Sequence, residues 1–221
     1  YRIEKKERVP MHKLNPQELE SKLLYKLMTG TIVPRPIAWV TSFSREHGVV
    51  NAAPFSYFNM VSSDPPLVAI SVVRRPDGEM KDTARNVTEH GELVVHICDE
   101  SLVEEMNRTA AVLPPGESEL GLTKLTLVDS DAVSVPGIAE AKVRLECRLE
   151  SHLPIKSDDG GITHDLLIAR ILRFQLEESI YDAEHVYVLT EKLRPVARLA
   201  GNEYAELGRL FRIARPVQPG G

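Results

Sequence analysis

The sequence predicts a mainly β protein: a small antiparallel β-barrel of about six strands with a few helices inserted between them. Two observations carry this prediction. Short runs rich in β-branched residues follow one another from Ile37 onward and are separated by turns that contain glycine or proline. Residues 141–151 alternate between apolar and charged or polar side chains, which is typical of an antiparallel strand with one face in the core and the other in water.

Composition limits the class of protein. The 221 residues fit one domain, and 43% hydrophobic with 27% charged residues is ordinary for a globular core. A net charge of −5 argues against a nucleic-acid partner, and no apolar run approaches the ~20 residues of a membrane span. No signal-peptide pattern opens the chain. Cys98 and Cys147 lie in strand-like runs, so we expect buried free thiols and a cytoplasmic protein.

The N-terminal segment, residues 1–24, is interpreted as a charged arm that leads into a helix. Asn15 is expected to cap this helix, with Pro16 in its first turn and Glu18 completing a capping box. Leucines at helical spacing continue the pattern, and Gly30 is expected to end it.

The remaining elements follow from apolar runs and turn residues. Asp82 is expected to begin a helix that Gly91 closes, and Ser101 with Glu104 predicts a second capping box for a helix that ends near Thr109. The expected strands span residues 37–43, 49–55, 67–73, 93–98, 141–151 and 165–176.

The stretch NAAPFSYFN, residues 51–59, is unusual for a strand that only fills a core. Thr41 and Ser42 end one predicted strand, and residues 51–56 lie across the hairpin from them. Small side chains would let a flat ligand approach the backbone, whose N–H and C=O groups suit a ring with amide-like edges. The alternative is an edge strand that contains a proline and ordinary turn residues.

A second cluster, Arg74-Arg75 followed by Lys81-Asp82-Thr83, surrounds the start of the helix at residues 82–90. Free N–H groups at a helix N-terminus, a lysine and a hydroxyl together favour an anion such as a phosphate monoester. The alternative is that Asp82 caps the helix and the arginines are solvated.

Motifs for other chemistries are absent. The sequence contains no G-x-G-x-x-G, no P-loop and no G-x-S-x-G. The seven histidines show no metal-binding spacing, so no metal is expected.

Five segments occur in the order and spacing of the flavin reductase-like family. They are VPRPIAWVTS, NAAPFSYFN, DPPLVAISV, KDTARN and RPVARLAGNEY, and the resemblance extends from about Tyr25 to Tyr204. It implies an FMN-binding split β-barrel over residues 25–205, a C-terminal tail at 206–221, and a homodimer.

The resemblance also implies roles for individual residues. Thr41 and Ser42 would contact the ribityl or phosphate part of FMN, and the ring edge would lie along residues 51–53 with a wall beyond it. The implied cofactor-binding residues are Thr41, Ser42, Asn51, Ala52, Ala53, Ser56, Tyr57, Phe58, Arg74, Lys81, Asp82, Thr83 and Asn86.

His164 is the implied catalytic residue. Shorter reductases of this group carry a Gly-Asp-His triplet near the nicotinamide, whereas this chain has Ile162-Thr163-His164 and retains only the histidine. His164 as an ordinary strand-end residue therefore stays an alternative. Trp39 and Tyr187 could stack on a flavin or fill the core, and Trp39 is expected in the core because it lies mid-strand.

Three functional hypotheses follow. The first is an oxidoreductase that passes a hydride from NADH or NADPH to bound FMN, with a partner oxygenase or redox protein as acceptor. The second is a flavoredoxin-like electron-transfer protein that holds FMN tightly and has no nicotinamide site of its own. The third omits flavin and assigns the phosphate-like site to another ligand or a partner chain.

Overall fold

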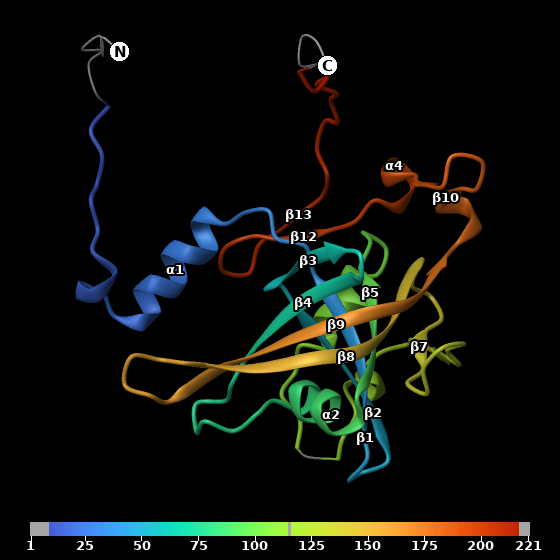
Figure 1. Cartoon of the computed structure of the whole chain (residues 1–221), viewed down its shortest axis with the longest axis horizontal. Coiled ribbons are helices and arrows are strands. Elements are labelled where there is room, and N and C mark those ends of the chain that lie inside the picture. Colours follow the sequence, from blue (N-terminus) through green and yellow to red (C-terminus); the bar gives the residue numbers. More distant parts are fainter. Residues whose placement is uncertain (1–8, 115, 217–221) are drawn as a thin grey trace.

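The computed structural model describes residues 9–114 and 116–216, and its main feature is a seven-stranded antiparallel sheet (Figure 1). Its strands, in spatial order, are β2 (Val49–Phe55), β1 (Ala38–Ser44), β5 (Glu92–Ile97), β8 (Val143–Lys156), β9 (Ile162–Leu176), β4 (Pro66–Val73) and β3 (Phe58–Ser63). The helices are α1 (Ser21–Thr31), α2 (Asp82–His90), α3 (Val103–Arg108) and α4 (Thr190–Leu193).

Shorter elements connect these. The 3-10 helices are η1 (Pro16–Glu18), η2 (Glu119–Leu122) and η3 (Glu178–Ile180). Three two-stranded ribbons pair β6 (Leu127–Val128) with β7 (Gly137–Ile138), β10 (Tyr181–Asp182) with β11 (Tyr187–Val188), and β12 (Ala197–Arg198) with β13 (Tyr204–Ala205).

The two edge strands, β2 and β3, are neighbours in sequence, separated only by Ser56 and Tyr57. The sheet must therefore curl so that its opposite edges approach one another, and Tyr57 C=O accepts a hydrogen bond of 2.9 Å from Ser71 N–H of β4. Within the described residues β2 and β3 form no ladder, so the barrel is not closed. The prediction of a mainly β, antiparallel protein is confirmed.

The sheet is buried on both faces where β1 crosses it. Ala38 and Val40 pack with Ala84 and Val87 of α2, whereas Trp39 points to the other face, packs near Met106 of α3 and donates 3.0 Å to Thr109 Oγ1. Trp39 is fully buried, which confirms the core prediction. Full burial of each large apolar side chain contributes roughly 1.5–3 kcal/mol to the hydrophobic stabilisation of such a core.

The predicted N-terminal helix from Pro16 to Gly30 is wrong as one element. Asn15 Oδ1 accepts from Gln17 N–H at 3.2 Å, but the short helix η1 that it caps ends at Glu18, because Leu19 adopts extended backbone angles. The α-helix begins afresh at Ser21 and passes through Gly30. Residues 1–8 and 217–221 of the predicted arm and tail lie outside the described residues.

The predicted capping box at Ser101 is also wrong. Asp99 Oδ1 accepts from Ser101 N–H (2.8 Å) and Ser101 Oγ (2.6 Å), and α3 begins two residues later with Leu102 as its N-cap. Strand β3 was not predicted, and β8 and β9 extend beyond the predicted limits of 141–151 and 165–176.

Helix α1 stands beside the sheet rather than on it (Figure 1). Only Thr29 of this helix is buried, while Leu23, Tyr25, Leu27 and Met28 are between 39% and 56% exposed. In the described ranges, no helix is both long and apolar enough to cross a bilayer.

Candidate functional site

Three clefts meet at Pro54 and Phe55, at the end of edge strand β2. The first, here the α2 cleft, has a volume of about 480 Å³ and is lined by Ala53 and by Lys81 to Thr83 at the start of α2. The second, the His164 cleft, has about 530 Å³. The third, the hairpin cleft, has about 560 Å³ and lies against the C-terminal ribbon. Lys81 lines both the α2 cleft and the His164 cleft.

A buried polar cluster lies behind the α2 cleft. The hairpin register places Ser42 opposite Asn51, and Asn86 of α2 donates from Nδ2 to Ser42 Oγ at 3.2 Å and to Asn51 Oδ1 at 3.1 Å. Asn51 and Asn86 are 5% and 3% exposed, so the amides hold α2 against the hairpin.

Glu119 of η2 completes this cluster from the open edge of β2. Its Oε2 accepts from Asn51 Nδ2 at 3.1 Å and from Ala52 N–H at 3.2 Å, and Glu117 C=O accepts from Asn51 Nδ2 at 3.1 Å. The carboxylate is thus bound to two donors that the sequence predicts for a ring edge. No motif predicts Glu119, because only the fold brings this residue to β2.

Thr41 and Ser42 point to opposite faces of β1 and are both fully buried. Thr41 Oγ1 donates to Pro136 C=O at 2.8 Å, and Ser42 Oγ is bonded to Asn86. In this structure both hydroxyls bond to protein groups, and their predicted contact with the ribityl or phosphate part of FMN stays a prediction.

The start of α2 carries the cation expected for an anion site. Lys81 is the N-cap residue and makes no side-chain cap bond. It has no ion pair within the described residues, and burial, followed by the charge of Arg75, lowers the pKa of its ammonium group. Asp82 is not the cap: its carboxylate binds Arg75 at 2.7 Å and Arg85 at 3.0 Å, so the alternative of a capping aspartate with solvated arginines is wrong.

Arg74 forms an ion pair with the buried carboxylate of Asp165. Its Nε and Nη2 each lie 2.9 Å from the carboxylate oxygens of Asp165, whose side chain is fully buried. His152 Nε2 lies 2.8 Å from Asp165 Oδ1. Burial raises the pKa of Asp165, but the hydrogen bonds from Arg74 and His152 outweigh this and lower it overall. This geometry holds Arg74 in place as a bridge from β4 to β9, and its contact with a phosphate stays a prediction.

His164 forms a flat wall with Tyr57. The two rings are stacked, with centroids 6.1 Å apart and an interplanar angle of 11°, and both line the His164 cleft. Partial burial lowers the pKa of the His164 imidazole, which keeps the ring neutral near pH 7, and burial followed by Tyr25 raises the pKa of Tyr57.

The predicted site residues therefore fall into separate groups. Ser56 lines the His164 cleft and its Oγ accepts from Arg35 Nε at 3.4 Å, while Phe58 lines a fourth cleft beside Pro34 and Pro36. Cleft-lining positions are Ala53, Ser56, Tyr57, Phe58, Arg74, Lys81, Asp82, Thr83 and His164; Thr41, Ser42, Asn51, Ala52 and Asn86 lie behind the clefts. Among the described residues no group of three or more potential ligands is placed to hold a metal ion.

A curled antiparallel sheet with three clefts at the end of its edge strand β2 defines a mainly β protein. Comparison with known proteins then identifies its family. The family model described as "Flavin reductase like domain" matches residues 29–195, so the chain belongs to the flavin reductase-like family. The resemblance seen in the five sequence segments is confirmed.

Solved structures agree with this assignment. The chain is 49% identical to nitrilotriacetate monooxygenase component B from Bacillus cereus, with a TM-score of 0.89 and coverage of 93% of this chain and 100% of that one. It is 30% identical to the 2-nitrobenzoate 2-nitroreductase NbaA from Pseudomonas fluorescens, with a TM-score of 0.83 and coverage of 95% and 99%. A Shewanella frigidimarina protein with a split barrel domain shares the fold alone, at 18% identity, a TM-score of 0.78 and coverage of 94% and 100%.

Proposed function

We propose that this protein is an FMN-binding oxidoreductase that takes electrons from NADH or NADPH. The observation that carries the proposal is the junction of the α2 cleft and the His164 cleft at Pro54 and Phe55, with Lys81 lining both. Lys81 is a cation without an ion pair in the described residues, and Tyr57 with His164 forms a stacked pair of flat rings in the His164 cleft. An elongated ligand with a phosphate and a flat ring suits that arrangement.

The residues present fit FMN by their chemistry. Lys81 and the N–H groups at the start of α2 would bind the phosphate, as charged and backbone donors do at helix N-termini. Ala53 and Pro54 have small side chains that leave the strand backbone accessible, and Tyr57 with His164 would form the adjoining wall. Bound FMN would supply the hydride and electron chemistry that no protein side chain provides.

Glu119 sets a condition on this binding mode. For Asn51 Nδ2 and Ala52 N–H to meet a ring carbonyl, Glu119 has to release the hydrogen bonds that it now accepts from both donors. The His164 imidazole, neutral near pH 7, adds no charge to the wall that it forms with Tyr57. We infer that His164 packs against a flat reactant, and a proton-transfer role for it stays a prediction.

Partners and setting are proposed with the function. The B. cereus neighbour is named as one component of a monooxygenase and NbaA as a nitroreductase, which supports a partner oxygenase, a redox protein or a nitroaromatic acceptor. We further propose a homodimer, residues 25–205 as the flavin-binding unit with split-barrel architecture, and a cytoplasmic location, where the buried free thiols Cys98 and Cys147 would stay reduced.

A flavoredoxin-like electron-transfer protein is the second candidate. It is favoured by Ile162 and Thr163, which stand where shorter reductases have glycine and aspartate. Both candidates require flavin, so they differ only in whether a nicotinamide nucleotide reduces the protein directly.

Two measurements test the proposal. Absorbance spectra of the protein with added FMN or FAD should show a bound flavin, and their absence would leave only the third hypothesis, a ligand or partner other than flavin. Anaerobic stopped-flow reduction by NADH and by NADPH should then be faster than reduction of free FMN. An equal rate would reject the reductase and retain the electron-transfer protein.

A further inference from the structure

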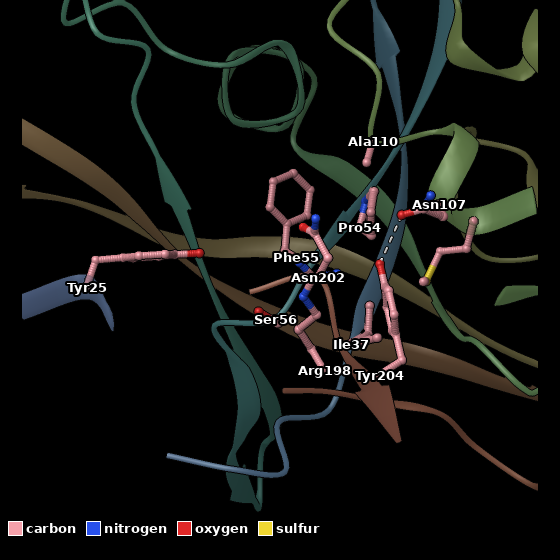
Figure 2. A pocket seen from close by; sticks show the side chains of 11 residues that line it. Tyr25, Ile37, Pro54, Phe55, Ser56, Asn107, Ala110, Arg198, Asn202 and Tyr204 are labelled. Carbon is pink, nitrogen blue, oxygen red and sulfur yellow. Dashed lines mark hydrogen bonds between the residues drawn. The ribbon is translucent and has the colours of Figure 1, made fainter. Parts of the chain in front are cut away.

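The hairpin cleft is a third compartment beside the site, and of the predicted cofactor-binding residues only Ser56 lines it. Its floor is Pro54 and Phe55 of β2, and its walls come from Asn107 in α3 and from Arg198 and Tyr204 in the C-terminal ribbon. In the view of Figure 2 the side chains of Arg198 and Asn202 lie between Tyr25 on one side and the Tyr204–Asn107 pair on the other.

The ribbon that carries Arg198 is held rigidly against the fold. Arg198 exchanges two backbone hydrogen bonds with Arg35, of 2.9 and 3.1 Å, and the buried Arg35 guanidinium donates to Leu199 C=O at 2.7 Å. Tyr204 Oη donates to Asn107 Oδ1 at 3.1 Å. The cleft walls are thus fixed before any ligand enters, which reduces the entropy cost of binding.

The polar groups around the cleft are hydrogen-bond donors. Arg198 lies over the Tyr204 ring, 4.6 Å from its centroid, and donates from Nη2 to Gly201 C=O. It has no carboxylate partner within the described residues. Tyr204 donates to the side-chain oxygen Oδ1 of Asn107, so the side-chain N–H₂ of Asn107 stays available. Within the described residues neither this N–H₂ nor the side chain of Asn202 has a protein acceptor.

No acidic side chain lines the cleft among the described residues, whereas Pro54, Phe55 and Tyr204 contribute flat apolar groups to its lining. A guanidinium on an aromatic ring beside an amide donor is suited to a carboxylate or phosphate, and the apolar surface is suited to a planar group. We propose that the hairpin cleft binds a planar molecule that carries a carboxylate or phosphate, with Arg198 and Asn107 as its anion-binding residues.

The hairpin cleft adjoins the two clefts that we assign to the cofactor. It shares Pro54 and Phe55 with the α2 and His164 clefts, so a molecule bound there touches the same strand backbone as the cofactor proposed above. The assignment of this ligand as the second reactant of the flavin rests on the proposed function. Anion binding itself rests only on the geometry of the cleft.

The test is the affinity of small probes for the protein, measured with and without added FMN by calorimetry or ligand-observed NMR. Benzoate and nicotinamide mononucleotide present a carboxylate and a phosphate on flat rings, and benzamide is the neutral isostere of benzoate. We expect one of the anionic probes to bind at least 10-fold more tightly than benzamide, and the probe that binds identifies the anion. Failure of both, or equal binding of benzamide, would overturn the inference.

Variants locate the site. Asn107→Asp keeps the acceptor for Tyr204 and adds a negative charge, and Arg198→Gln removes the cation; each should weaken the anionic probe at least 10-fold. Arg209→Gln, the same charge change on an exposed segment, is the control. Retained affinity in both cleft variants, with unchanged melting temperatures, would also overturn the inference. Lys81→Ala should impair FMN binding but not probe binding, so failure of the flavin proposal and failure of this one are distinguishable.

Discussion

Lys81 lies partly buried at the start of α2, where burial and the nearby Arg75 lower the pKa of its ammonium group below the ordinary value. Binding of a phosphate favours the protonated lysine, so FMN affinity should fall as pH rises through this lowered pKa. Lys81→Ala should weaken FMN by about 1–3 kcal/mol, the contribution of a charged hydrogen bond, and flatten the pH dependence. Fluorescence titration over roughly pH 7–10 measures both effects.

Riboflavin is the matched ligand control, because it has the same ring and lacks the phosphate. Its affinity should not differ between the wild type and Lys81→Ala. An equal loss for riboflavin and FMN would place Lys81 at the ring instead of the phosphate.

His96 is a buried histidine whose hydrogen bonds define its neutral form. Nδ1 lies 2.8 Å from Trp39 C=O, and Nε2 accepts from Ile138 N–H at 2.9 Å. Burial lowers the pKa from 6.5 to about 4, so between these values the unfolded chain binds one more proton than the folded one. Stability should therefore fall by about 3 kcal/mol as pH drops from 6.5 to 4.

Chemical denaturation at several pH values measures this dependence. His96→Gln removes the titrating group, and its stability should decline less steeply over the same interval even though the variant starts from a lower value. The same slope in both proteins would show that other groups cause the acid sensitivity.

The strands β4, β8 and β9 are joined by one buried ionic cluster, in which Asp165 of β9 contacts Arg74 just beyond β4 and His152 of β8. Arg74→Ala should destabilise the fold more than Arg75→Ala, because it leaves the Asp165 carboxylate without its main partner. Arg75→Ala removes a partly exposed ion pair with Asp82, which keeps Arg85 as a partner, and should cost about 0–1 kcal/mol. Urea denaturation compares the two variants.

The same pair of variants tests the predicted phosphate contact of Arg74. Loss of FMN affinity in Arg74→Ala with wild-type stability would favour that contact over the structural role that we assign to this residue.

Elements with a clear local pattern were predictable, and those set by tertiary contacts were not. Alternation revealed β8, and the glycine Gly91, which adopts a left-handed backbone, revealed the end of α2. Strand β3 was not predicted because its apolar residues Met60 and Val61 are adjacent, so its sequence does not alternate. Both side chains are exposed in the structure. Helix α1 begins late because Leu19 is extended, a choice that the capping pattern at Asn15 does not encode.

At the scale of the whole molecule, the sequence indicated where clefts would lie but not the contacts behind them, and the assignment of these clefts as the cofactor site stays a prediction. The small residues at 52–54 and the cation Lys81 indicated clefts on β2 and at α2. Sequence could not show that Ser42 and Asn51 face inward, because that depends on how α2 packs against the hairpin. Nor could it show that Glu119, 67 residues along the chain from Ala52, lies against the same edge.

Helix α1 provides the prediction that concerns assembly. Its exposed apolar side chains, which include Leu23 and Leu27, have no partner among the described residues of one chain, so burial against a second copy would be favourable. We expect a dimer in light scattering after size exclusion, and a shift toward monomer for Leu27→Glu. Val186→Glu, on an exposed turn, should leave the mass unchanged. A monomeric wild type would contradict the proposed homodimer.

The open edge of β2 has a further consequence. Unpaired edge strands recruit strands of other molecules and promote aggregation. Here Ser118 Oγ donates to Val50 C=O, Glu119 accepts from Ala52 N–H, and Pro54 has no N–H to offer. The backbone groups that would pair with an added strand are therefore already hydrogen-bonded at Val50 and Ala52, and the N–H is missing at Pro54. The contacts that a ring would replace therefore also protect the ligand-free chain from association through this edge.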